Sequence, residues 1–242
     1  MFVYDTKIFE RELNQLQIRC MDVQLKKFLT FYELLVETNQ VMNLTAITEF
    51  DDVVEKHFLD SLFLQRVYDL EKAARERRTL LDLGTGAGFP GIPIKIAYPG
   101  LQVTLVDSLN KRVQFLNRVT EALSLEGVET LHARAEELAR NKLYREHFDI
   151  VVSRAVANLS TLSEYCMPFV KEGGYFISYK SAAVEDEVKQ AKRAIDLLGG
   201  EIADIHRFEL GEQKRSFVVI EKKKKTPKSY PRKAGTPSKD PL

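Results

Sequence analysis

The spacing of hydrophobic residues changes once along the chain, near residue 76. Before this point, apolar residues recur at helical spacing in three segments, which indicates amphipathic helices. The predicted helices cover residues 6–20, 22–38 and 51–74. After it, short apolar runs alternate with helical patterns, as in chains that fold into a parallel sheet covered by helices. We therefore expect a helical cap over residues 1–75 and an α/β domain over residues 76–221.

Seven short apolar runs in the second part are the candidate strands. They cover residues 79–83, 102–107, 130–132, 148–153, 175–179, 202–210 and 215–220. Helical patterns separate the first five, so these strands should be parallel. Only residues 211–214 separate the last two, which is too short for a crossover helix and predicts an antiparallel hairpin. The expected fold is a doubly wound, mostly parallel seven-stranded sheet of the Rossmann-like α/β class.

The turn after the first of these strands carries the first candidate chemistry. Asp82 lies on the strand, and Gly84, Gly86 and Gly88 follow at alternate positions before the next helix. Glycines let the backbone bend sharply and let a ligand lie against it. The next strand ends in Asp107, where such folds place an acid on a ribose hydroxyl pair. The stretch therefore predicts a nucleotide-binding turn.

The register of the glycines discriminates between two nucleotide cofactors. The letters G-x-G-x-x-G occur at Gly86, Gly88 and Gly91, which would suggest a dinucleotide such as NAD. However, the first glycine after the strand is Gly84, and an acid, Asp82, lies on the strand itself. This pattern resembles the first motif of S-adenosylmethionine-dependent methyltransferases, where no pyrophosphate has to be held. S-adenosylmethionine is therefore the favoured cofactor, and a glycine-rich turn without a ligand is the remaining alternative.

Composition restricts the class of protein further. The chain of 242 residues is 44% hydrophobic and 29% charged, has no apolar run of membrane-spanning length, and lacks a signal-peptide pattern at its start. Cys20 and Cys166 lie in helix-like stretches, which predicts reduced packing residues in a cytoplasmic protein. The four histidines show no metal-ligand spacing. We therefore expect neither a metal site nor a membrane partner.

The positive charge of the chain is concentrated at its C-terminal end. Residues 222–242 contain eight Lys or Arg and one Asp, a net charge of +7, whereas the whole chain carries +1. Such a basic tail is typical of a segment that binds a polyanion, or of a solubilising terminus. If the tail binds RNA, its deletion should reduce the salt dependence of RNA binding and leave the affinity for the cofactor unchanged.

Residues around the fourth predicted strand bear on which atom is methylated. Enzymes that methylate an exocyclic amine of adenine or cytosine usually have an Asn/Asp-Pro-Pro-aromatic turn there, but this chain has Ser153-Arg154-Ala155-Val156. Methylation of pyrimidine C5 needs a cysteine nucleophile, and neither cysteine is placed at a strand end. The remaining target is an atom with its own lone pair, such as guanine N7, which requires alignment and no catalytic base.

Several motifs together resemble the ribosomal RNA small-subunit methyltransferase G family, also called the glucose-inhibited division protein B family. They are Asn43-Leu44-Thr45-Ala46, Lys56-His57-Phe58-Leu59-Asp60-Ser61, the turn from Asp82 to Gly91, Asp107-Ser108-Leu109-Asn110-Lys111-Arg112, Ala135-Glu136-Glu137, Ser153-Arg154-Ala155 and Tyr230-Pro231-Arg232-Lys233-Ala234-Gly235-Thr236-Pro237. The resemblance covers nearly the whole chain. It implies an S-adenosylmethionine-dependent enzyme that methylates N7 of one guanine in 16S ribosomal RNA, either naked or in the 30S particle. The resemblance also implies that the cofactor contacts Gly84, Phe89, Asp107, Ala135, Glu136 and Arg154. The glycine turn adds Gly86 to these expected contacts.

Some of these positions have a purely structural alternative. Phe89 is also compatible with packing alone, and Glu136 with a solvated carboxylate at a helix start. Arg154 fits a contact to the cofactor carboxylate or to an RNA phosphate, and His57 and Asp60 fit pairing inside the helical cap. Two other functions also stay open. One is methylation of a small molecule or a protein, and the other is a non-catalytic, nucleotide-binding protein associated with ribosomes.

Overall fold

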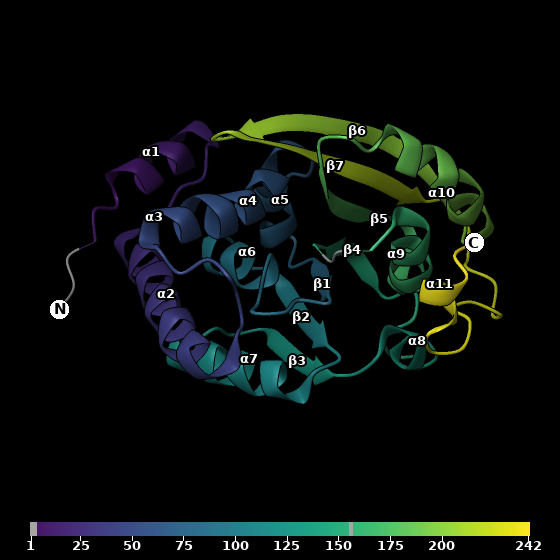
Figure 1. The fold of residues 1–242 in the computed structure, drawn as a ribbon, viewed down its shortest axis with the longest axis horizontal. Coiled ribbons are helices and arrows are strands. Elements are labelled where there is room, and N and C mark those ends of the chain that lie inside the picture. The colour runs from purple at the N-terminus through teal and green to yellow at the C-terminus, as the bar shows by residue number, and fades with distance from the viewer. Residues whose placement is uncertain (1–3, 155–156) are drawn as a thin grey trace.

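A seven-stranded sheet forms the centre of the structure, with helices on both of its faces (Figure 1). The computed structural model describes residues 4–154 and 157–242. The strand order is β3-β2-β1-β4-β5-β7-β6, in which the first five strands are parallel and β7 is antiparallel to both neighbours. The strands are β1 (Thr79–Leu83), β2 (Gln102–Asp107), β3 (Val128–His132), β4 (Phe148–Ser153), β5 (Val170–Ser181), β6 (Gly200–Leu210) and β7 (Gln213–Lys222). The predicted doubly wound sheet and its C-terminal hairpin are confirmed.

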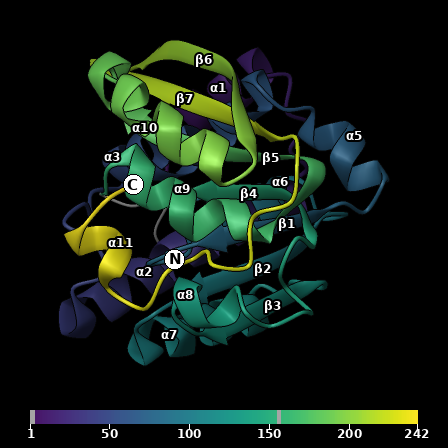
Figure 2. The same ribbon diagram turned by 90° about the vertical axis from the view of Figure 1, so that its right-hand side faces the viewer.

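Two groups of helices cover the two faces of the sheet (Figures 1 and 2). Helices α6 and α7 pack on one face with α2 and α4 outside them, whereas α9 and α10 pack on the other with α8 beside α9. The helices are α1 (Lys7–Gln15), α2 (Asp22–Met42), α3 (Phe50–Val53), α4 (Asp60–Leu62), α5 (Leu70–Arg75), α6 (Gly91–Ala97), α7 (Asn110–Ala122), α8 (Ala135–Leu138), α9 (Leu159–Cys166), α10 (Glu185–Leu197) and α11 (Thr236–Lys239), with a π-helical turn (Val54–Leu59) and two 3-10 turns (Phe63–Arg66 and Met167–Phe169).

The central strands send alternate side chains to the two faces of the sheet, as the twofold repeat of a strand requires. Leu80 and Ile150 belong to the apolar cluster beneath α6 and the N-terminal helices. The next residues, Leu81 and Val151, belong to the cluster beneath α9 and α10. Because both faces are covered, both sets are apolar, and the sequence shows continuous apolar runs rather than alternation.

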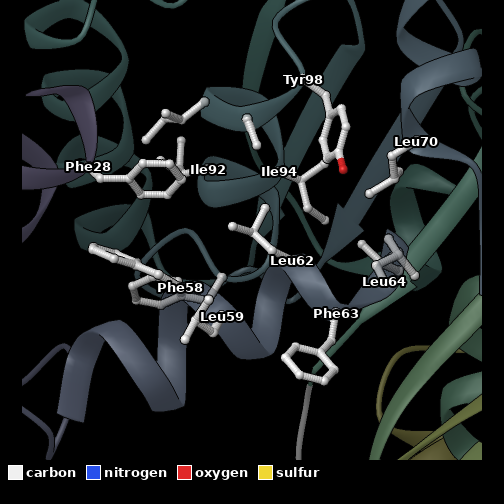
Figure 3. Close-up of a cluster of buried hydrophobic side chains, with 14 of the residues drawn as sticks. Phe28, Phe58, Leu59, Leu62, Phe63, Leu64, Leu70, Ile92, Ile94 and Tyr98 are labelled. Carbon is white, nitrogen blue, oxygen red and sulfur yellow. The ribbon is translucent and has the colours of Figure 1, made fainter. Parts of the chain in front are cut away.

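Side chains from the N-terminal helices extend the first of these clusters (Figure 3). The rings of Phe28 from α2 and Phe58 from the π-helical turn have centroids 5.1 Å apart. Figure 3 shows Leu62 of α4 pointing toward Ile94 of α6, and all four side chains are buried. The N-terminal helices therefore share one apolar cluster with the sheet and are held in a fixed position against it.

The N-terminal part corrects one predicted helix. The pattern over residues 51–74 predicted a continuous helix, but the structure divides it into α3, the π-helical turn, α4, a 3-10 turn and α5. The Asp69 carboxylate accepts a hydrogen bond from the Lys72 amide (2.8 Å) and caps α5, and Gln65 accepts one from the Leu70 amide (3.0 Å). Polar side chains that bind backbone amides therefore interrupt an apolar period that looks continuous in the sequence.

Other helix boundaries also differ from the prediction. Helix α1 ends at Gln15, so Cys20 lies in a loop rather than in a helix, whereas Cys166 does end α9. Helix α2 begins at Asp22 as predicted but extends to Met42, four residues beyond the predicted end at residue 38. These shifts leave the order and direction of the strands unchanged.

The C-terminal segment runs back across the layer of α8 and α9 (yellow in Figure 2). Its first residue, Lys222, ends β7, and the buried ammonium group donates a hydrogen bond to the Met167 carbonyl (2.7 Å). The Arg145 guanidinium donates to the carbonyls of Thr226 (2.9 Å) and Tyr230 (3.0 Å). The segment is therefore held against the sheet domain, and part of its positive charge is used inside the protein.

Candidate active site

Asp82 holds the turn after β1 in place from inside the fold. Its Oδ2 atom accepts hydrogen bonds from the Thr85 hydroxyl (2.6 Å) and the Gly91 amide (2.8 Å). A Cβ atom would lie 2.6 Å from α6 if built on Gly88, and 2.4 Å from a β2 side chain if built on Gly91. Gly86 has φ +61°, and no described atom outside its chain neighbours lies within 4 Å of such a Cβ. Two of the glycines therefore face the core, whereas Gly86 faces open space.

The Asp82 carboxyl itself is fully buried, and this burial raises its pKa from 3.8 to about 6. The hydrogen bonds from Thr85 and Gly91 oppose the shift, but both reach Oδ2. Within the described residues, the other oxygen, Oδ1, has no hydrogen-bond partner. Burying a polar atom without a partner costs stability. Asp82 therefore organises the turn at the expense of stability, which is typical of a functional position.

Asp107 lies beside this turn at the end of β2, and only 3% of the residue is exposed. Its carboxylate accepts hydrogen bonds from the amides of Gly86 and Leu109, both at 2.9 Å, and Arg112 lies 3.4 Å from Oδ2. The bond to Gly86 joins the expected ribose-binding acid to the open side of the glycine turn. The two predicted binding elements therefore form one continuous surface.

A first cavity, of about 350 Å³, lies at this surface. Its lining includes Arg112, Tyr165 and four of the predicted cofactor residues, which are Gly84, Asp107, Ala135 and Glu136. Gly235 and Ser238 of the C-terminal segment also line it, which the sequence analysis missed. No local pattern could have placed them there, because Gly235 contacts Glu136 across 99 positions of the chain.

A second cavity, of about 710 Å³, adjoins the first, and Ala157 lines both. It lies between the N-terminal helices, the residues after β4, and strands β5 and β7. Four of the six charged residues in its lining are positive, namely Lys56, Arg154, Lys180 and Arg215, and the two negative residues are Asp60 and Glu187. His57 also lines it. His57, Asp60 and Arg154 belong to the predicted motifs, and the structure brings these three together.

Asp60 is the centre of the ion pairs in the second cavity, and 2% of its side chain is exposed. Its Oδ2 atom accepts a hydrogen bond from Arg154 (2.9 Å), and its Oδ1 atom accepts one from Arg215 Nε (3.1 Å). Lys180 forms a separate pair with Glu187 (2.6 Å). Lys180 and Arg215 were not predicted as site residues, because the packing of the strands determines their partners. The only sequence signal for Arg215 is its charge beside the apolar run of β7.

His57 and Phe89 pack against each other beneath Arg154. Their ring centroids lie 4.5 Å apart, and Arg154 Cζ lies 5.1 Å from the Phe89 centroid. His57 Nδ1 lies 3.0 Å from the Lys56 carbonyl and 3.3 Å from Arg154 NH2, and Nε2 lies 2.9 Å from the Thr45 hydroxyl. Burial and the Arg154 charge lower the pKa of His57 to about 4, so the ring is neutral at pH 7. Phe89 is 5% exposed and lines neither cavity.

Clusters of metal ligands and membrane-spanning helices are both absent from the part of the chain that the structure describes. In that part, no three His, Cys, Asp or Glu side chains form a group that could hold a metal ion. None of its helices combines the length and the apolar character needed to cross a bilayer. Two residues of the predicted motif, Ala155 and Val156, lie outside the described residues. The first three residues of the chain also lie outside them.

Solved structures with a similar fold define the class. TrmN from Thermus thermophilus aligns with a TM-score of 0.51 and 18% identity over 70% of this chain and about half (53%) of that one. A variant of the 16S rRNA (adenine(1408)-N(1))-methyltransferase from Catenulisporales acidiphilia, determined with its cosubstrate SAM, aligns with a TM-score of 0.52 and 14% identity over 66% of this chain and 92% of that one. At these identities the likeness establishes the fold, which is that of the class I S-adenosylmethionine-dependent methyltransferases.

Much more similar sequences establish the family. The model of the rRNA small subunit methyltransferase G family matches residues 24–218. The chain is 51% identical over 240 residues to the ribosomal RNA small subunit methyltransferase G of Lachnoclostridium phytofermentans, covering 98% of each chain. It is 48% identical over 233 residues to that of Staphylococcus aureus strain Newman, covering 96% of this chain and 95% of the relative. The chain therefore belongs to this family of S-adenosylmethionine-dependent enzymes, which confirms the cofactor expected from the glycine register.

Proposed function

We propose that the protein transfers a methyl group from S-adenosylmethionine to N7 of a guanine in 16S ribosomal RNA, naked or within the 30S particle, in the cytoplasm. Ribosomal RNA as the substrate class is supported by relatives that are matched over at least 95% of their length and are named ribosomal RNA small subunit methyltransferase G. The choice of N7 rests on one observation. The described acidic side chains that line the second cavity are already paired with cations.

A methyl acceptor that carries a proton at the reacting atom requires a base to remove it. The carboxylates of Asp60 and Glu187 are held by arginine and lysine side chains. Both ring nitrogens of His57 have hydrogen-bond partners, and its low pKa makes the ring a weak base. Guanine N7 has a free lone pair and needs no base. The lining of the second cavity therefore suits this atom better than an amine or a hydroxyl group.

A covalent mechanism through cysteine does not fit the same site. Cys166 is fully buried in α9, and burial raises its thiol pKa well above the ordinary value. Cys20 lies in a loop of the N-terminal region, and burial raises its thiol pKa to about 11. Attack on pyrimidine C5 requires a thiolate. The positions and the protonation states of both thiols therefore support the choice of a lone-pair nucleophile.

We place the cofactor in the first cavity. The residues there fit it, because Asp107 lines the cavity at the strand end that meets a ribose in this fold. Gly86 does not line the cavity, but its amide binds Asp107 and it leaves open space beside the backbone. We assign the adenosine side to Gly84, Gly86, Asp107, Ala135 and Glu136. Arg154 and Phe89 lie toward the second cavity, so we assign them to the side on which the methyl group is transferred.

The chain itself contributes binding and alignment. When bound, the cofactor supplies a methyl group attached to a positively charged sulfur. The second cavity holds the guanine so that N7 lies in line with that methyl group, which requires the base to leave its stack. Four cationic side chains of the cavity lining favour the phosphates around the base, and these are Lys56, Arg154, Lys180 and Arg215. We assign no side chain to proton transfer.

Identification of the methylated nucleoside tests this function. The protein is incubated with labelled S-adenosylmethionine and with unmodified 16S ribosomal RNA, unmodified 30S particles or a cell extract. The products are then digested and analysed by mass spectrometry. We expect 7-methylguanosine from at least one RNA substrate, and no product from a Gly86→Val control, whose side chain would occupy the open space of the turn.

Each alternative predicts a different result in the same assay. N6-methyladenosine or 5-methylcytidine without 7-methylguanosine would refute the proposed target atom. Label that appears only in protein or in small molecules would favour those substrates instead. Binding of RNA and cofactor without any transfer would favour a non-catalytic protein associated with ribosomes.

A further inference from the structure

We propose that residues 232–238 form one wall of the cofactor site, so that docking of this segment and binding of S-adenosylmethionine favour each other. The proposal rests on the proposed position of the cofactor in the first cavity. Its basis is that Gly235 and Ser238 line that cavity although they lie beyond the last strand of the sheet. The C-terminal segment, expected from its charge to bind RNA or to solubilise the chain, thereby acquires a role in cofactor binding.

A buried ion pair anchors the start of this segment. The Glu164 side chain of α9 has no exposed surface. Its two oxygens accept hydrogen bonds from Nε (3.0 Å) and NH2 (2.7 Å) of Arg232, and one of them also accepts from the Arg232 amide (2.7 Å). Bidentate pairs of this kind are geometrically specific. Because an unpaired carboxylate is strongly unfavourable in the interior, Glu164 requires the segment to dock.

Three hydrogen bonds hold the part of the segment after Arg232 over the first cavity. The Gly235 amide donates to Glu136 Oε1 (2.9 Å), and the hydroxyl oxygens of Tyr165 and Ser238 lie 2.8 Å apart. The Thr161 hydroxyl donates to a carbonyl of α11 (2.9 Å). Glu136 and Tyr165 also line the cavity. The segment therefore contacts the very side chains that form the rest of the wall.

The bond from Gly235 orients a side chain that we assign to the cofactor. Glu136 is 7% exposed and uses one carboxylate oxygen for the Gly235 amide. Among residues 4–154 and 157–242 we find no hydrogen bond to its second oxygen, which leaves that atom available at the cavity. Gly235 has φ +81°, a conformation that glycine adopts readily and other residues avoid. Gly235 is therefore a positioning residue that acts through Glu136.

The exposed charges of the segment serve a separable purpose. Lys233 and Lys239 are exposed and line neither cavity. Exposed lysines can contact phosphates, and such contacts make RNA binding sensitive to salt. They do not shape the first cavity. Substitution of these lysines should therefore alter RNA binding only, whereas a change of backbone at Gly235 should alter cofactor binding.

Two full-length variants test this separation by calorimetry with S-adenosylhomocysteine in the absence of RNA. Gly235→Pro keeps every charge but removes the amide donor and cannot adopt a positive φ. The matched control, Lys233→Ala with Lys239→Ala, removes two charges and keeps Gly235. We expect Gly235→Pro to raise the Kd about tenfold, as for loss of a hydrogen bond to a charged group. The control should bind like the wild type. Equal affinities of Gly235→Pro and the wild type would overturn the proposal.

Limited digestion of the wild-type protein gives a second measurement that does not depend on how a variant folds. Trypsin can cleave after Lys233 in the segment and after Arg77, an exposed residue in the turn before β1. Because a ligand stabilises the conformation that binds it, saturating S-adenosylhomocysteine should slow cleavage after Lys233 relative to Arg77. Equal effects at both sites, or no effect, would contradict the coupling.

The outcome also distinguishes this proposal from the proposed function. A wild-type protein that does not bind S-adenosylhomocysteine refutes both. A wild-type protein that binds the ligand, with unchanged affinity in Gly235→Pro, refutes only the role of the segment. The identity of the methylated nucleoside stays a separate test, because it depends on the second cavity.

Discussion

The buried carboxyl of Asp82 should make the stability of the fold depend on pH. Burial raises its pKa from 3.8 to about 6 in the folded protein. In the unfolded chain the group is solvated and loses its proton at a lower pH. The folded state therefore binds the proton more tightly, and the stability contributed by protonated Asp82 is present below pH 3.8. It is lost as the pH rises through about 6.

The size of this effect follows from the difference between the two pKa values. About two pKa units correspond to about 3 kcal/mol when the group is ionised in both states. Between pH 4.5 and pH 7.5, the stability of the folded wild type decreases by about 2 kcal/mol through Asp82 alone. Asp82→Asn removes the titration, while its side-chain oxygen still accepts hydrogen bonds from Thr85 and Gly91. We therefore expect the stability of Asp82→Asn relative to the wild type to rise by about 2 kcal/mol between these pH values.

Urea unfolding of both proteins, followed by circular dichroism at pH 4.5 and pH 7.5, measures the four free energies of unfolding. Other titrating groups are common to both proteins, so their contributions cancel in the comparison. A difference between the proteins that does not change with pH would show that Asp82 keeps an ordinary pKa and would refute the reasoning. Calorimetry at pH 7.5 should also show weaker binding of S-adenosylhomocysteine by Asp82→Asn, because the buried negative charge beside the turn is lost.

Three further sets of substitutions test the turn and the two cavities. Gly86→Ala should weaken binding of S-adenosylhomocysteine and destabilise the fold by only about 1 kcal/mol. Gly88→Ala should lower the Tm more than Gly86→Ala does, because its Cβ would lie 2.6 Å from a side chain of α6. Calorimetry measures the loss of binding and thermal melts measure the loss of stability, so the two variants can be distinguished. Asp107→Ala should weaken cofactor binding by about 1–3 kcal/mol in calorimetry, and unchanged affinity would argue against a ribose contact. Asp60→Ala should lower the free energy of unfolding by about 3 kcal/mol, the lower end for a buried pair. Adding Arg215→Ala should recover part of this loss in urea unfolding, and strictly additive losses would contradict the pairing.

The central strands were predictable because burial alone defines them. β1, β2 and β4 begin and end at the residues where their apolar runs do, since helices cover both faces. β5 begins five residues earlier than its predicted start at residue 175. Its first part includes Lys171, Glu172 and Gly173, which the apolar pattern does not mark. The juxtaposition of Gly86 and Asp107 was predictable for a related reason, because consecutive parallel strands end at the same edge of the sheet.

Contacts between distant segments could not be predicted in the same way. Asp60 meets Arg215 across 155 positions, and Glu136 meets Gly235 across 99. Neither pair leaves a local signature, since each depends on where packing places the hairpin and the C-terminal segment. The location of Phe89 shows the limit of motif reasoning, because a residue inside the glycine turn packs under Arg154 instead of lining the first cavity.

The π-helical turn Val54–Leu59 constrains the number of residues that its segment can contain. A π-helical turn accommodates more residues than a turn of α-helix, so it shifts the angular phase of what precedes it. This phase lets Phe58 enter the apolar cluster while Asp60 reaches the second cavity. Loss of one residue would restore a regular α-helix and rotate the preceding helix by about 100° relative to Asp60. Deletion of a single residue between Val54 and Leu59 should therefore move Asp60 away from Arg154 and Arg215, even where every other side chain is kept.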